Sequence, residues 1–202
     1  MRVGLFGGSF DPIHQGHVEP VLEAQRQLAL DRVVYLPTAF PPHKRARSFA
    51  PALARFAMVE LALLDHADLW VSSHELTLDR PAYTVETLAH FRAAEPESDL
   101  FLIIGADSFL EFSSWVRWRE ILDLARLVVL TRPGFLPDAS QAALAPELQA
   151  AVDAGLVHFV ENTPLAVSST EVRRCLAAGD SIPDGWLSPR VVGYAAKYRL
   201  YQ

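Results

Sequence analysis

The chain has 202 residues, half of them hydrophobic, and a formal net charge of −6 at pH 7. This length allows one domain with a substantial core, and the acidic balance argues against a broad nucleic-acid-binding surface. A single cysteine, Cys175, excludes an intramolecular disulfide and a zinc site built from several cysteines. No apolar run approaches the about 20 residues that span a bilayer, and no signal-peptide pattern is recognisable. We therefore expect a cytoplasmic protein that binds neither membranes nor nucleic acid.

Apolar runs and helical periodicity alternate along the sequence. In chain order we predict a strand at 2–6, a helix at 17–30, a strand at 32–36, a loop at 38–48, a helix at 52–64, a strand at 69–72, a helix at 83–94, a strand at 100–105, a helix at 117–124, a strand at 127–131, a helix at 146–154, a strand at 157–160, and helices at 169–178 and 189–199. This alternation predicts an α/β fold, a Rossmann-like doubly wound parallel sheet with helices on both faces. We expect residues 1–202 to form a single domain that binds ligands at the carboxyl ends of its strands.

The first candidate site directly follows the first predicted strand. Gly7, Gly8 and Ser9 allow the backbone to turn sharply and to bring its N–H groups close to an anion. The stretch has neither the G-x-G-x-x-G dinucleotide pattern nor a Walker A lysine. We predict a phosphate-binding loop of another kind.

Two histidines follow at a spacing of three, which would bring His14 and His17 to one side if this segment forms a first helical turn. Imidazole N–H groups can donate to phosphate oxygens, and a protonated histidine adds positive charge. Two alternatives stay open. One histidine could cap the helix while the other packs, or the two could bind a metal, although no third ligand is evident. We favour contact with phosphate.

Residues 7–17, GGSFDPIHQGH, resemble the opening signature of the nucleotidyltransferase superfamily that carries an H-x-G-H element. The resemblance implies transfer of a nucleotidyl group with release of pyrophosphate. It implies that His14 and His17 stabilise the pentavalent α-phosphate without forming a covalent intermediate. It also implies that the loop from Gly7 to Phe10 binds ATP, and we expect Asp11 to stabilise this loop rather than to bind a metal.

A second candidate lies far downstream, in VSSTEVRR at residues 167–174. Ser168 or Ser169 is a good helix N-cap, and Glu171 stands at capping-box spacing from Ser168, so a well-capped helix is one interpretation. Hydroxyl and N–H groups at the positive end of a helix dipole also suit a triphosphate. Arg173, one turn further on, can reach back with a planar fork of donors.

The same stretch resembles the S-S-T-x-hydrophobic-R motif of that superfamily. The resemblance implies that Ser168, Ser169, Thr170 and Arg173 bind the β- and γ-phosphates of ATP. Residues 168–202 would then complete the ATP site.

Three internal stretches narrow the choice of acceptor: PPHK at 41–44, RPAYTVETL at 80–88 and IIGADSFLEFSSW at 103–115. All three resemble the bacterial nicotinate-nucleotide adenylyltransferase branch, and the similarity extends over nearly the whole chain. The resemblance implies that the substrates are ATP and nicotinate mononucleotide and that the products are nicotinate adenine dinucleotide and pyrophosphate. Mg²⁺ would accompany ATP and be held mostly by phosphates and water, so we name no protein ligand for it.

The resemblance also assigns residues to the acceptor. It places Trp115 against the pyridine ring, and backbone N–H groups near Tyr83 and Thr84 and after Trp115 on the carboxylate. A packed core position for Trp115 and an N-cap role for Thr84 are the structural alternatives. Trp118, spaced with Ile121 and Leu122, is expected to be structural.

Further residues are assigned to ribose and phosphate. Asp107, close behind Gly105, would bind a ribose of ATP, although it could simply cap a helix. In the basic cluster at 43–47 we expect Lys44 to contact phosphate and the two arginines to be surface residues. Arg132 is a weaker candidate for the acceptor phosphate.

Three alternative functions can be weighed against the sequence. The same reaction could use nicotinamide mononucleotide, or both pyridine nucleotides. The related phosphopantetheine adenylyltransferases normally have a Thr-x-Gly-His version of the first motif, from which this sequence departs. A nucleotide-binding regulator without turnover is disfavoured because His14, His17 and Arg173 are all present. A homo-oligomer is compatible with the sequence, which leaves the oligomeric state open.

Overall fold

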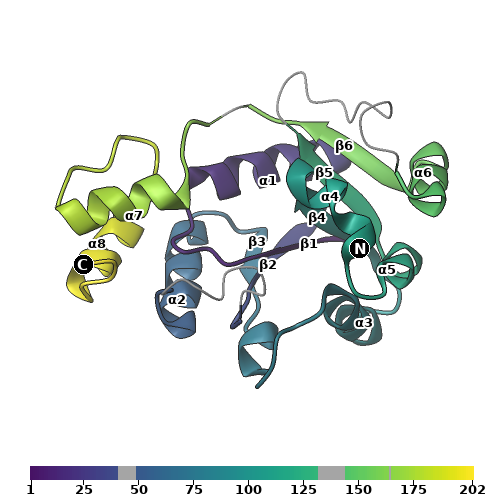
Figure 1. Cartoon of the computed structure of the whole chain (residues 1–202), viewed down its shortest axis with the longest axis horizontal. Coiled ribbons are helices and arrows are strands. Elements are labelled where there is room, and N and C mark those ends of the chain that lie inside the picture. Colours follow the sequence, from purple (N-terminus) through teal and green to yellow (C-terminus); the bar gives the residue numbers. More distant parts are fainter. Residues whose placement is uncertain (41–48, 132–143, 164) are drawn as a thin grey trace. The chain divides into compact units, whose positions relative to one another are not determined.

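The computed structural model describes residues 1–40, 49–131, 144–163 and 165–202 (Figure 1). Its strands are β1 (Arg2–Gly8), β2 (Arg32–Pro37), β3 (Leu69–Val71), β4 (Asp99–Gly105), β5 (Arg126–Thr131) and β6 (Val157–Glu161). Its α-helices are α1 (Gln15–Leu28), α2 (Ala52–Leu63), α3 (Thr84–Ala94), α4 (Ala106–Leu110), α5 (Trp118–Leu124), α6 (Pro146–Asp153), α7 (Ser169–Ala178) and α8 (Pro189–Lys197). Two 3₁₀ helices are labelled η1 (His74–Thr77) and η2 (Phe112–Ser114).

The strands form one sheet in the order β3-β2-β1-β4-β5-β6. β4 pairs in parallel with β1 and with β5, and β5 pairs in parallel with β6, so that Leu102 lies opposite Leu5 on one side and Leu127 on the other. The residues from Leu100 to Ile104 are all buried, as expected for a central parallel strand covered on both faces. This order is that of a doubly wound α/β fold, and the predicted fold class is confirmed.

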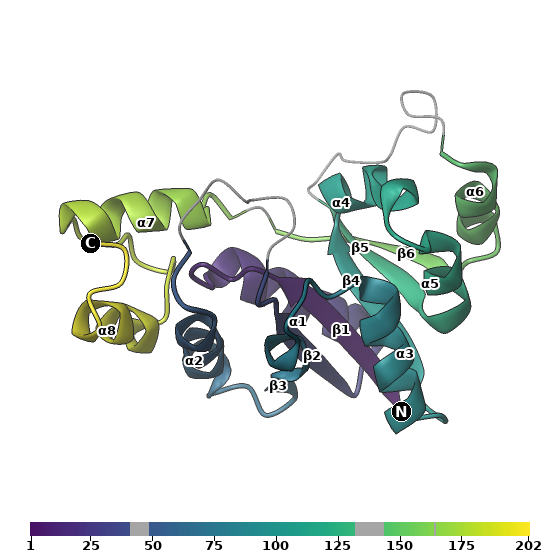
Figure 2. The same ribbon diagram turned by 60° about the horizontal axis from the view of Figure 1, so that its bottom comes forward.

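The described chain divides into two compact units. Unit 1 comprises Met1–Phe6, Pro20–Val33 and Ala82–Thr163, and within it α3 packs against α5. Unit 2 comprises Gly7–Glu19, Val34–Pro81 and Pro164–Gln202, and within it α2 packs against β3 and α8, as Figure 2 shows. The expectation that residues 1–202 form one domain stays a prediction.

Most predicted elements are present with bounds shifted by one or two residues. β1 continues through Gly7 and Gly8, and the Gly8 carbonyl accepts a hydrogen bond of 3.0 Å from the N–H of Thr38. The short helices η1, α4 and η2 were not predicted, because about one turn of helix contains too few residues to show a periodicity. Residues 41–48 of the predicted loop lie outside the described residues.

Candidate active site

The backbone of the loop after β1 packs closely against the buried ring of Phe10. Phe10 is 1 % exposed, has a φ of +45°, and packs against Tyr35 at 5.6 Å between ring centroids. A Cβ at Gly8 would lie only 2.8 Å from the Phe10 ring, so the close approach of the backbone to this ring requires a glycine. Gly7, in contrast, faces open space.

The two histidines that follow the loop are stacked, with 3.8 Å between ring centroids. The His14 N–H donates to Nδ1 of His17 at 3.2 Å, and the His17 and Phe10 rings form a T-shaped pair with 5.3 Å between their centroids. Because Nδ1 accepts a hydrogen bond, the ring proton of a neutral His17 must sit on Nε2. His17 thus presents a hydrogen-bond donor without needing to be protonated.

His14 is the more deeply buried member of the pair, with 8 % of its surface exposed. Burial lowers the pKa of His14 to about 4, so its imidazole is neutral at pH 7 in this environment. Its Nδ1 atom is buried and has no hydrogen-bond partner within the described part of the chain. A phosphate bound nearby would favour the protonated form.

Gly16, between the histidines, lies where two distant segments of the chain meet. A Cβ there would lie 3.0 Å from Nδ1 of His14 and 3.1 Å from Cγ1 of Val167. Both distances are tighter than ordinary van der Waals contact, so the absence of a side chain lets the segment before α7 approach the histidine pair. The neighbouring Gln15 N–H also reaches the C-terminal region, donating to the Trp186 carbonyl at 2.9 Å.

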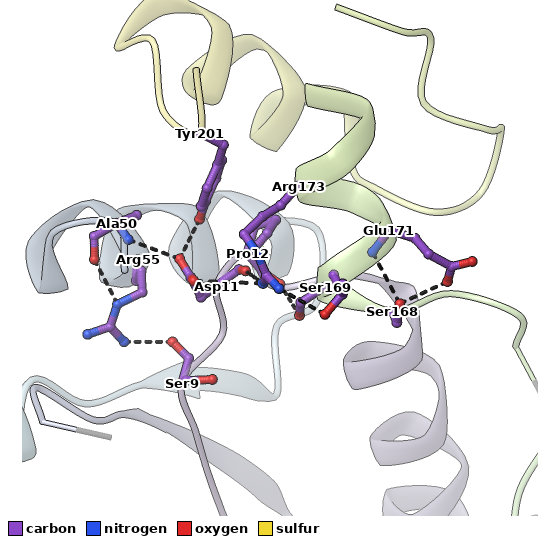
Figure 3. Close-up of polar contacts among 11 residues, drawn as sticks. Ser9, Asp11, Pro12, Ala50, Arg55, Ser168, Ser169, Glu171, Arg173 and Tyr201 are labelled. Carbon is purple, nitrogen blue, oxygen red and sulfur yellow. Dashed lines mark hydrogen bonds and ion pairs between the residues drawn. The ribbon is translucent and has the colours of Figure 1, made fainter. Parts of the chain in front are cut away.

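Helix α7 begins with a capped turn, shown in Figure 3. The Ser168 hydroxyl accepts a bond of 3.2 Å from the Glu171 N–H and donates to Oε2 of Glu171 at 2.8 Å. The Ser169 hydroxyl donates to the Pro12 carbonyl at 3.1 Å. The capped helix predicted from the sequence is confirmed. Both serine hydroxyls have protein partners and the Glu171 N–H donates to the cap, so the N–H groups of Ser169 and Thr170 are the backbone donors that this end of α7 can offer an anion.

Arg173 connects α7 to the first loop. Its Nη1 donates to the Asp11 carbonyl and lies 3.7 Å from Oδ2 of Asp11 (Figure 3). Its Nη2 donates to Oγ1 of Thr170 at 2.9 Å. The two sequence signatures, 162 positions apart at these residues, are therefore in contact within unit 2. That they bind ATP stays a prediction.

Arg55, on α2, is a further residue of this region that we did not predict. Its side chain is 1 % exposed and donates to three backbone carbonyls: Ala50 at 3.1 Å, Ser9 at 2.6 Å and Thr38 at 2.7 Å. Burial lowers the pKa of Arg55, whereas the nearby Asp11 charge raises it. The helical spacing in the sequence could have indicated that Arg55 is buried, because it puts Arg55 on the same face as Met58 and Val59, which are both buried.

Asp11 holds its loop, as expected. Its carboxylate is 1 % exposed, and Oδ1 accepts bonds from the Ala50 N–H at 3.1 Å and from the Tyr201 hydroxyl at 2.8 Å. Tyr201, the penultimate residue of the chain, was also missed by the sequence reasoning. Tyr201 belongs to none of the sequence motifs described above, so no spacing could have predicted its contact with Asp11.

The candidate acceptor residues Tyr83, Thr84 and Trp115 lie in unit 1. Trp118 is 6 % exposed and packs edge-on against Phe112, so its structural role is confirmed. Trp115 also packs against Phe112, at 5.4 Å, but remains half-buried rather than enclosed in the core. It keeps surface available for a ligand.

Tyr83 and Thr84 lie at the start of α3, the helix that packs against α5. Tyr83 occupies the N-cap position without a side-chain cap and is 44 % exposed, and Thr84 is the first helical residue. The alternative in which Thr84 caps the helix is therefore wrong. The hydroxyl of Thr84 could not accept from the second or third helical N–H from this position.

Gly105 ends β4 and is the N-cap residue of α4, and Asp107 lies exposed in the first turn of that helix. No side chain caps α4, so the capping alternative for Asp107 is wrong as well. Lys44 and Arg132 lie outside the described residues, as do Arg45 and Arg47.

Comparison with known proteins agrees with these signatures. A model of the family described as "Cytidylyltransferase-like" matches residues 5–175. A protein of Aeromonas salmonicida named "Probable nicotinate-nucleotide adenylyltransferase" is 38 % identical over 99 % of this chain and 97 % of its own length. A protein of the same name from Pseudomonas aeruginosa is 40 % identical over 100 % of this chain and 97 % of its own.

The chain belongs to the nicotinate-nucleotide adenylyltransferase branch of the cytidylyltransferase-like family. The fold of the chain matches that of a solved nicotinic acid mononucleotide adenylyltransferase from Plasmodium falciparum, complexed with NaAD. The TM-score is 0.76 over 99 % of this chain and 97 % of that one, at 20 % sequence identity. The family resemblance inferred from the two signatures is confirmed.

Two properties of this adenylyltransferase-family chain concern metals and membranes. Within residues 1–40, 49–131, 144–163 and 165–202, no group of three or more His, Cys, Asp or Glu side chains could hold a metal ion. No helix of the described chain has the length and apolar character needed to cross a bilayer.

Proposed function

We propose that this chain transfers the adenylyl group of ATP to the 5′-phosphate of nicotinate mononucleotide, giving nicotinate adenine dinucleotide and pyrophosphate. The observation that carries the proposal is the contact between the first loop and α7, made by Arg173 with Asp11 and by Ser169 with Pro12. This contact places a stacked histidine pair and a helix N-terminus in the same compact unit. The choice of nicotinate mononucleotide as the acceptor is supported by the names of the two relatives, which match nearly the whole chain.

The reaction needs no general base, because the attacking phosphate is already an anion. A phosphate oxygen of the acceptor attacks the α-phosphorus in line, a new P–O bond forms, and the bond to the bridging α–β oxygen breaks as pyrophosphate leaves. The main obstacle is the repulsion between two polyanions. Catalysis is therefore positioning together with stabilisation of the negative charge that develops on the α-phosphate oxygens.

Each group of unit 2 has a defined part in this scheme. His17 donates from Nε2 to an α-phosphate oxygen, and His14, neutral until phosphate raises its pKa, adds a second imidazole. Arg173 and the first N–H groups of α7 bind the β- and γ-phosphates. The N–H groups of the loop from Gly7 to Phe10 complete the ATP contacts, and we retain Lys44 as a phosphate contact.

The acceptor assignments of Trp115, Tyr83 and Thr84 belong to unit 1. The half-buried Trp115 offers an aromatic face to the pyridine ring. The N–H groups at the start of α3, beside Tyr83 and Thr84, suit the carboxylate. Asp107 suits a ribose hydroxyl of ATP, and we keep Arg132 as a candidate for the acceptor phosphate.

We expect a divalent cation, Mg²⁺, to enter with ATP and to neutralise charge on its phosphate oxygens. We expect phosphates and water, rather than the protein, to hold this ion, because the Asp11 carboxylate already accepts hydrogen bonds from Ala50 and Tyr201. The cytoplasmic location and the absence of nucleic-acid binding remain predictions, and the oligomeric state stays open.

The test is to incubate the protein with ATP, Mg²⁺ and each pyridine mononucleotide in turn and to measure pyrophosphate. We expect release with nicotinate mononucleotide. Release with the nicotinamide compound alone would overturn the acceptor assignment. No release with either would overturn the function and favour a nucleotide-binding regulator.

A further inference from the structure

We propose that Tyr201, the penultimate residue, is a positioning residue that acts through Asp11 to hold Arg173 at the ATP phosphates. The inference rests on the proposed function and extends it to the C-terminal end of the chain. No motif singles out Tyr201. The evidence is the way its hydroxyl, the Asp11 carboxylate and the Arg173 guanidinium are arranged in unit 2 (Figure 3).

The first step is the bond between Tyr201 and Asp11. The Tyr201 hydroxyl donates to Oδ1 of Asp11 at 2.8 Å, and the Ala50 N–H donates to the same oxygen at 3.1 Å. Asp11 is 1 % exposed, so its carboxylate depends on protein donors in place of water. Two donors on Oδ1 fix the plane of the carboxylate and therefore the direction of its second oxygen.

The second step runs from Asp11 to Arg173. Nη1 of Arg173 donates to the Asp11 carbonyl and lies 3.7 Å from Oδ2 of the carboxylate. Only 14 % of the Arg173 side chain is exposed. A guanidinium has five N–H donors in a rigid plane, so fixing one edge of it on Asp11 orients the remaining donors. Asp11 is therefore the link through which a change at Tyr201 reaches Arg173.

The backbone at the end of the chain is bent to make this contact. Arg199 and Tyr201 have φ angles of +51° and +70°, a region that side chains other than glycine rarely occupy. The Leu200 N–H donates to the Ala195 carbonyl at 2.9 Å, which anchors the bend to the end of α8. Unfavourable backbone angles persist only where surrounding contacts outweigh their cost, and the hydroxyl bond to Asp11 is such a contact.

The variant Tyr201→Phe removes one hydroxyl and keeps the ring. We expect the kcat/KM for ATP to fall about tenfold, with the KM for the acceptor unchanged. Tyr198→Phe is the matched control, because Tyr198 is 55 % exposed and packs against Tyr194 at 4.6 Å, outside the Asp11 contacts described above. The control should behave as wild type, and thermal melts of both variants identify any general loss of stability. Equal loss for both substrates in Tyr201→Phe would overturn the proposal.

A double-mutant cycle tests whether Tyr201 acts through Arg173. In an Arg173→Ala background, Tyr201→Phe should produce no further loss of ATP use, because the group that it positions is gone. If Tyr201→Phe reduces kcat/KM by the same factor with and without Arg173, the proposal is overturned.

Titration calorimetry with ATP separates this inference from the proposed function. If wild type binds ATP but releases no pyrophosphate with either acceptor, the proposed function fails, and the binding arm still tests Tyr201. A weaker ATP affinity in Tyr201→Phe than in Tyr198→Phe, abolished in the Arg173→Ala background, supports the positioning role. An ATP affinity in Tyr201→Phe equal to that of wild type overturns it, whatever the turnover.

Discussion

The donor character of His17 comes from its neighbour's backbone. The His14 N–H donates to Nδ1 of His17, so the ring proton of a neutral His17 lies on Nε2. Such a donor stabilises charge that develops in the transition state, and the loss of one donor of this kind typically costs about 10²–10³ in kcat.

We therefore expect His17→Ala to lower kcat by about two to three orders of magnitude while the protein remains folded. Steady-state kinetics with circular dichroism measures both. His66→Ala, in the turn after α2, is the control and should retain wild-type turnover. Near-normal turnover in His17→Ala would remove His17 from the mechanism.

His14 makes stability depend on pH. Its folded-state pKa of about 4 lies below the ordinary histidine pKa of 6.5, so the unfolded chain binds more protons at intermediate pH. The stability associated with the neutral imidazole is therefore present above pH 6.5 and is lost as the pH falls toward 4. Between pH 6.5 and pH 5 the loss amounts to about 1–2 kcal/mol.

His14→Phe keeps an aromatic ring and removes the titration. Urea unfolding at pH 6.5 and pH 5 should show a smaller loss of unfolding free energy in this variant than in wild type, by about 1–2 kcal/mol. The same pH dependence in both proteins would contradict the origin that we assign to it.

At the scale of elements, Gly16 is the point at which the start of α1 meets the segment before α7. Gly16→Ala puts a methyl group 3.0 Å from His14 and 3.1 Å from Val167, so one of them must move. We expect a destabilisation of about 1–3 kcal/mol and a loss of turnover, measured by thermal melts and the pyrophosphate assay. Gly193→Ala in α8, where the added methyl meets nothing within 4 Å, should be neutral or stabilising. Equal behaviour of the two variants would contradict the argument.

Ser168 belongs to the second signature and is also the N-cap of α7, so its contribution to stability can be measured apart from any role in ligand binding. Ser168→Ala removes the bond to the Glu171 N–H and should cost about 1 kcal/mol, which lowers Tm by about 2–4 °C in a chain of this size. Ser168→Asn supplies another capping oxygen and should restore the stability. If Ser168→Asn melts like Ser168→Ala, the cap does not account for the stability.

Prediction from sequence succeeded best for elements with long periodic patterns. The residues of α7 were predicted correctly, and Ser168, one of the two serines offered as its cap, is the N-cap, because capping residues and apolar spacing are local features. The start of α1 was predicted two residues late, at His17 in place of Gln15, because the hydrogen bond from the Gln15 N–H to the Trp186 carbonyl joins residues far apart in the sequence. The capping roles offered for Thr84 and Asp107 failed because Tyr83 and Gly105 occupy those cap positions with backbone alone.

At the scale of the whole molecule, the chain passes between the two compact units five times, after residues 6, 19, 33, 81 and 163. Three of these crossings fall inside β1, α1 and β2, so single elements belong to both units. Neither unit can therefore unfold without disrupting elements of the other. We expect one cooperative thermal transition with equal calorimetric and van't Hoff enthalpies, measured by scanning calorimetry. Two resolved transitions would contradict the single domain predicted for residues 1–202.

By itself the sequence determined the α/β class, the family and the two signatures, because the periodicity and the motifs that indicate them involve residues close together in the chain. Only the tertiary structure decided that Asp11 accepts from Tyr201, 190 positions away, and that Arg55 binds three carbonyls around the first loop. Contacts of this kind depend on how buried groups find partners after the chain has packed. Local periodicity and motif spacing do not predict these hydrogen-bond partners. A polar group needs such a partner only once it is buried, and burial arises only in the folded protein.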